Sequence, residues 1–78
     1  MAMGRPIPAV ELSSQVRCEL EGWSRSRLLP AGIVRRARIL LMAGDGLNNK
    51  TIAQKVGLSG AMVGLWRKRF LAQGLAGL

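Results

Sequence analysis

The chain has 78 residues, of which 49% are hydrophobic and 21% are charged. This length permits one small domain, and the hydrophobic content argues against wholesale disorder. Twelve lysines and arginines against four acids give a formal net charge of +8, and the single Cys18 excludes an intrachain disulfide.

The positive charge is concentrated after Gly22, where ten basic residues are accompanied by one acid. Such an excess indicates a polyanionic partner, either nucleic acid or an anionic membrane surface. The longest apolar run, "ILLMAG", is far shorter than the ~18 residues that a membrane span needs, and no targeting segment is visible at the N-terminus. We therefore expect a cytoplasmic protein that binds nucleic acid and no membrane.

Few residues in this chain could perform catalysis. It has no histidine, and its closest acids, Glu19 and Glu21, stand two apart on an expected helix and so point to different faces. A metal or acid–base site has almost nothing to be built from. We expect no enzyme activity, no metal site and no cofactor.

Residues 1–10 are expected to form a flexible arm, and residues 11–78 a single domain. Pro6 and Pro8 disfavour a helix in the arm. The tripeptide "GRP" resembles the arms with which some proteins enter an A·T-rich minor groove, which makes Arg5 a candidate DNA contact. The alternative is a disordered tail.

Four helices are expected in the domain. The first carries one apolar stripe, begins at Ser13 or Ser14 and ends near Gly22. The second begins with Pro30 in its first turn and runs to about Ala43. Its inward face is expected to comprise Ile33, Val34, Ala37, Leu40, Leu41 and Gly44.

The third helix is expected to start after the cap Asn48 and to end at Val56, and the fourth to run from the cap Ser59 to about Gln73. No strand pattern is present, so the fold class is all-α. Only Gly57-Leu58-Ser59 joins the last two helices. A connection this short predicts the steep crossing of a helix-turn-helix.

The fourth helix separates into two faces on a helical wheel. Val63, Trp66 and Phe70 are expected to point inward. The opposite side is expected to carry Ala61, Gly64, Leu65 and Lys68, with Gly60 beside them and Arg67 and Arg69 on the shoulders. Small residues let a helix backbone approach a major groove, and basic residues then reach phosphates. The alternative is an ordinary solvated face.

These patterns predict a double-stranded DNA partner. Ser59 is a candidate cap and phosphate ligand, Lys68 a base or phosphate ligand, and Arg67, Arg69 and Lys50 candidate phosphate ligands. The amides of Asn49 and Lys50 could also hold a phosphate. Because the exposed face offers few donors to base edges, we expect phosphate contacts to dominate the affinity.

The run "VRRARILLMAGDGLNNKTIAQKVGLSGAMVGLWRKRFLAQGLAGL", Val34 to Leu78, resembles the N-terminal DNA-binding region of IS630-type bacterial insertion-sequence transposases, relatives of the Tc1/mariner group. The resemblance implies a homeodomain-like helix-turn-helix unit of three helices that binds terminal inverted repeats, here with an additional N-terminal helix. Family members commonly carry arginine after the cap serine, where this chain has Gly60.

The resemblance also implies a downstream catalytic domain with an acidic Mg²⁺ triad. No such domain follows Leu78, so we expect this chain to be the DNA-binding part of a transposase, cut before the catalytic domain. Two alternatives stay open. One is a stand-alone transcriptional regulator that binds DNA as a homodimer, and the other is a basic protein-interaction module.

Overall fold

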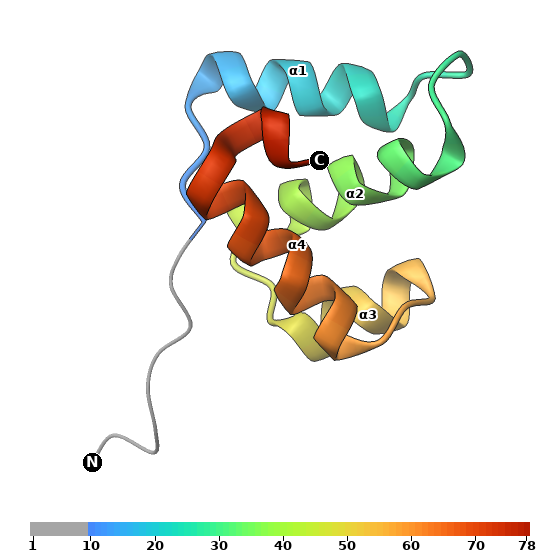
Figure 1. The fold of residues 1–78 in the computed structure, drawn as a ribbon, viewed down its shortest axis with the longest axis vertical. Helices are drawn as coiled ribbons and strands as arrows, with labels where there is room; N and C mark the ends of the chain where they lie inside the picture. The colour runs from blue at the N-terminus through green and yellow to red at the C-terminus, as the bar shows by residue number, and fades with distance from the viewer. Residues whose placement is uncertain (1–9) are drawn as a thin grey trace.

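The computed structural model describes residues 10–78, all of which lie in helices or the loops between them. Residues 1–9, which include Arg5 and most of the expected arm, lie outside the described part. Four α-helices, shown in Figure 1, are followed by one 3-10 turn: α1 (Ser14–Ser24), α2 (Ala31–Gly44), α3 (Asn49–Val56), α4 (Gly60–Gln73) and η1 (Gly74–Gly77). The all-α fold class is confirmed.

Three helices begin at side-chain caps. The oxygens of Ser13, Asn48 and Ser59 accept hydrogen bonds from the backbone N–H groups three residues later, at 3.1, 2.8 and 3.2 Å. Each cap satisfies one of the four N–H groups that a helix leaves unpaired at its start. The predicted starts of the third and fourth helices are therefore confirmed to the residue.

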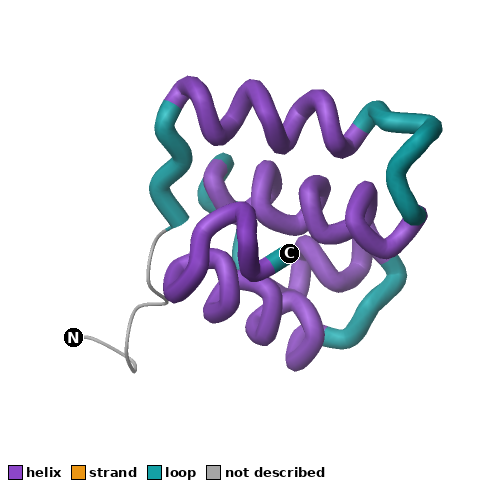
Figure 2. The backbone as a smooth tube through the Cα atoms, turned by 45° about the horizontal axis from the view of Figure 1, so that its top comes forward, coloured by secondary structure: helices purple, strands orange, loops and turns teal. Residues whose placement is uncertain are grey.

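The centre of the fold is α2, which packs against α1 on one side and against α3 and α4 on the other. Figure 2 shows α1 as an outer layer along α2. The largest fully buried side chains lie between these layers: Leu20, Ile39, Leu40, Ile52 and Val63. Ile39 was not among the residues expected to face inward. That prediction assumed one buried face on the helix, whereas α2 is covered by other helices on two sides.

The beginning of α1 and the residues just before it pack against the end of α2. A Cβ at Gly44 would lie 2.6 Å from Leu12 Cδ1, so only glycine permits this approach without a shift. Arg17 also donates a hydrogen bond to Asp45 across the same junction, at 3.0 Å. Val10, expected to be the last residue of the flexible arm, is instead buried in the core.

Candidate nucleic-acid interface

The turn between α3 and α4 is built around Gly57. This residue has φ 76°, a left-handed conformation that suits glycine, and its amide donates to the carbonyl of Ala53 at 2.9 Å. The amide of Leu58 donates to the same carbonyl at 3.2 Å. The chain therefore turns from α3 into α4 within three residues, and Ile52 of α3 and Val63 of α4 are both fully buried.

The inward face of α4 comprises the three predicted apolar residues Val63, Trp66 and Phe70, all of which are buried. Their burial fixes the rotation of α4 about its own axis. The opposite side of the helix is consequently turned to solvent.

Most of the predicted outer residues are exposed. Ala61, Lys68 and Arg69 are exposed, and Leu65 exposes 38% of its surface. Ser59 and Gly60 are exposed at the start of the helix. The hydroxyl of Ser59 accepts from the amide of Met62 and keeps its own O–H free to donate to a phosphate.

Met62 belongs to the same face, with 39% of its surface exposed, although the sequence reasoning did not include it. It lies next to Ala61 and three residues before Leu65. Because residues three apart on a helix are neighbours on its surface, this spacing could have predicted that Met62 shares the face. Together, Ala61, Met62 and Leu65 give the first turns of α4 an exposed apolar surface.

Gly64 faces α3 and does not share the outer face expected for it. It is half-buried, and a Cβ built on it would lie 3.4 Å from Asn49 Nδ2. The small residue at this position therefore sits where α4 crosses the first turn of α3.

Asn49 and Lys50 begin α3 beside α4. Lys50 is exposed, whereas Asn49 is half-buried, and its Oδ1 is buried with no hydrogen-bond partner among residues 10–78. The side chain of Asn48 accepts a hydrogen bond from the amide of Thr51. The amides of Asn49 and Lys50, in the first turn of α3, are therefore available to donate to an external acceptor.

Arg67 does not lie on the shoulder of α4, and this expectation was wrong. The residue is only 6% exposed, and its Nη1 donates to the carbonyl of Leu47 at 3.4 Å. Burial lowers the pKa of Arg67 from its ordinary value by desolvation. Because Arg67 follows Val63 by four residues, the helical period itself places it on the inward face.

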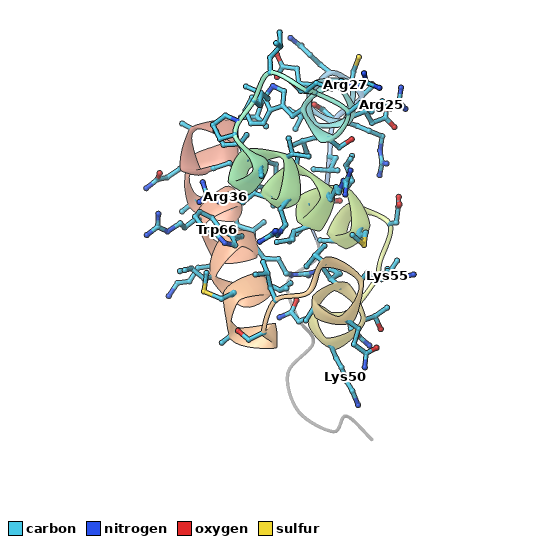
Figure 3. All side chains as sticks on the ribbon, turned by 90° about the vertical axis from the view of Figure 1, so that its right-hand side faces the viewer. Arg25, Arg27, Arg36, Lys50, Lys55 and Trp66 are labelled. Atoms are coloured by element: carbon cyan, nitrogen blue, oxygen red, sulfur yellow. The ribbon has the colours of Figure 1, made fainter. Side chains whose placement is uncertain are left out.

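Arg69 lies beside Trp66, together with Arg36 of α2. The Arg36 Cζ is 4.0 Å and the Arg69 Cζ 5.2 Å from the centroid of the Trp66 ring, both within the range of a cation–π interaction. Figure 3 shows Arg36 and Trp66 adjacent on the α4 side of the molecule, with Lys55 on the opposite side. The sequence reasoning did not single out Arg36 because its neighbour Trp66 is thirty positions away.

The arrangement of α2, α3 and α4 is matched by a protein-family model. Residues 30–78 match the homeodomain-like domain, which is more than half of the chain. The chain belongs to the homeodomain-like family. No curated protein and no solved structure matches it.

In homeodomains the third helix of the unit lies in the major groove. In this homeodomain-like chain the matched region starts at Pro30, so α2, α3 and α4 form the three-helix unit and α1 is the additional helix. The exposed face of α4 thus belongs to the helix that reads DNA in such domains.

Two other kinds of site have no support in the described residues. Among residues 10–78, no three histidines, cysteines or acids come together in a way that could hold a metal ion. No helix in that range is long and apolar enough to cross a membrane.

Proposed function

We propose that this homeodomain-like chain binds double-stranded DNA with the first turns of α4 in the major groove. The observation that carries the proposal is the exposed face of α4, where Ala61, Met62 and Leu65 are apolar and Lys68 and Arg69 are basic and exposed. Apolar side chains contact thymine methyl groups, and lysine and arginine contact phosphates or guanine. The net charge of +8 adds long-range attraction to DNA.

We further propose that the DNA in question is the terminal inverted repeat of an insertion element, and that the chain is the DNA-binding part of its transposase. The support is the resemblance of Val34–Leu78 to IS630-type transposases described above. In that role, the chain brings the element ends to a catalytic domain elsewhere in the protein and performs no strand transfer itself.

A band-shift titration with a randomised duplex pool, followed by sequencing of the bound fraction, tests both proposals. We expect the logarithm of the binding constant to fall linearly with the logarithm of the salt concentration, by about 0.9 per phosphate contact. Absence of binding, or binding that does not respond to salt, would overturn the DNA proposal.

The selected sequences separate the two biological roles. A transposase region predicts a site that recurs, inverted, at the two ends of an insertion element. A stand-alone regulator, which fits the homeodomain-like fold equally well, predicts a two-fold symmetric site bound by a dimer. Sedimentation of the complex measures which stoichiometry is present.

A further inference from the structure

We propose that Arg36 and Arg69, both stacked near Trp66, form a phosphate site for the DNA backbone along the α2 side of α4. This inference rests on the proposed DNA binding and adds a residue of α2 to it. It assigns a role to Arg36, which is not among the DNA-contacting residues predicted from the sequence.

Arg36 and Arg69 differ from other arginines of the domain in their polar contacts. Among residues 10–78, Arg17 pairs with Asp45, Arg38 donates to the carbonyl of Ser24, and Arg67 donates to that of Leu47. Arg36 and Arg69 have neither a hydrogen-bond acceptor nor a carboxylate partner in that range. A guanidinium carries five N–H donors, so both groups keep their full donor sets for an external acceptor.

Both guanidinium groups lie near one buried ring. The Arg36 and Arg69 Cζ atoms are 4.0 and 5.2 Å from the centroid of Trp66, which is buried. Arg36 also runs back along α2, since a Cβ built on Gly32 would lie 3.5 Å from Arg36 Nη2. Two positive charges are therefore held near one neutral ring, and a phosphate that contacts both would offset their charge.

Arg36 and Trp66 lie beside the exposed face of α4. Next to the ring lies a small hollow of 110 Å³, lined by Gly32, Arg35, Arg36, Leu58, Met62 and Trp66. Met62 belongs to the exposed face of α4, so the hollow borders the surface proposed to enter the groove. Arg69 follows Ala61 by eight residues, which places it about 12 Å farther along the helix.

This spacing matches DNA. The major groove is about 8.5 Å deep, so in a helix that enters it with its first turn, a residue about 12 Å farther along lies at or above the level of the backbone. Lys50 lies at the start of α3 on the other flank of α4, where Asn49 faces Gly64. The two flanks of α4 would thus contact the two strands that border one groove.

The test measures the salt dependence of binding for single and double variants on one duplex from the selected pool. Arg36→Ala and Arg69→Ala are each expected to reduce the slope of log binding constant against log salt, and the double variant to reduce it by about 0.9 in total, because both guanidinium groups contact one phosphate. At 0.1 M salt, a loss of about 0.9 corresponds to about eightfold weaker binding. Lys55→Ala, an exposed basic residue on the other side of the molecule, is the control and should keep the wild-type slope.

A second readout locates the contact. Neutral methylphosphonate linkages are placed one at a time along the duplex. At the phosphate that the arginines contact, the neutral linkage should weaken binding by the wild-type protein and should not weaken binding by Arg36→Ala any further. Circular-dichroism melting shows that each variant is folded at the assay temperature.

The results separate the two proposals. If the wild-type protein binds DNA and Arg36→Ala keeps its slope and its phosphate sensitivity, the Arg36 site is wrong and the DNA-binding proposal stands. If the wild-type protein does not bind DNA, both proposals fail.

Discussion

Arg67 and Lys68 are neighbours in the chain with opposite surroundings. The guanidinium of Arg67 is buried and donates to the carbonyl of Leu47, which ties α4 to the loop before α3. The side chain of Lys68 is exposed on the outer half of α4. A buried polar group that loses its partner weakens folding, whereas an exposed cation facing phosphates contributes to binding. These two residues should therefore separate stability from affinity.

We predict that Arg67→Ala lowers the free energy of unfolding by about 1–3 kcal/mol, because the carbonyl of Leu47 is left without this donor and a cavity is formed. Lys68→Ala should change it by less than about 0.5 kcal/mol and reduce the salt slope of DNA binding by about 0.9. Urea titration and a salt series measure the two quantities. The reverse pattern would contradict the placement of both residues.

The helical period of the sequence predicts which residues of α4 face the core and which face solvent. The inward positions of Val63, Trp66 and Phe70 follow from their spacing alone. Arg67 shares that spacing, but its charge favoured an exposed position, and its hydrogen bond to the carbonyl of Leu47 across the fold is visible only in the structure. The pairing of Arg36 with Trp66 depends on how α2 crosses α4, which no local pattern encodes.

The turn elements were the most predictable part of the fold. Asn48 and Ser59 each accept from an amide three residues later, and Gly57 supplies a positive φ, so chemistry within four residues fixes both boundaries. The direction in which Gly64 faces was not predictable in this way. It depends on Asn49 of the neighbouring helix. The small residues of α4 are therefore not all small for the same reason.

We predict opposite effects on stability for alanine at two glycines of the helix-turn-helix. Gly64→Ala should raise the free energy of unfolding by about 0.5–1 kcal/mol, because its Cβ meets Asn49 at an ordinary contact distance of 3.4 Å in a helix interior. Gly57→Ala should lower it by about 1–3 kcal/mol, since alanine is strained at φ 76°. Thermal melts of both variants check the signs.

Binding by Gly64→Ala adds a second test at the scale of the element. Since Gly64 faces α3, its alanine variant should bind DNA within about twofold of wild type. A strong loss of affinity in a protein with a raised melting temperature would show that Gly64 itself approaches the DNA.

At the scale of the whole molecule, α1 completes the core that the homeodomain-like unit leaves open. Leu20 of α1 is fully buried, although the family match begins only at residue 30. A domain of this size is stable by roughly 4–12 kcal/mol, so a single core side chain on α1 is a large share of the total. The burial of Ile39 on α2 was not predictable, because it required knowing that α2 is covered from two sides.

We predict that Leu20→Ala lowers the free energy of unfolding by about 2–5 kcal/mol. Leu28→Ala is the matched control, since Leu28 is 96% exposed, and it should stay within about 0.5 kcal/mol of wild type. Urea unfolding followed by tryptophan fluorescence measures both. A loss below about 1 kcal/mol for Leu20→Ala would mean that α1 is not an integral part of the fold.

DNA binding to the exposed face of α4 is tested most directly by introducing a negative charge on that face. Ala61→Glu places a carboxylate there without harming the helix, because an acid in the first turn is favourable. Gln15→Glu, on the exposed surface of α1, makes the same change in net charge elsewhere.

The measurement is the dissociation constant of both variants for one duplex at 0.1 M salt, by fluorescence anisotropy. The account predicts at least about tenfold weaker binding for Ala61→Glu, because like charges meet at the interface, and little change for Gln15→Glu, whose charge is screened over about 10 Å. Equal effects of the two substitutions would contradict it.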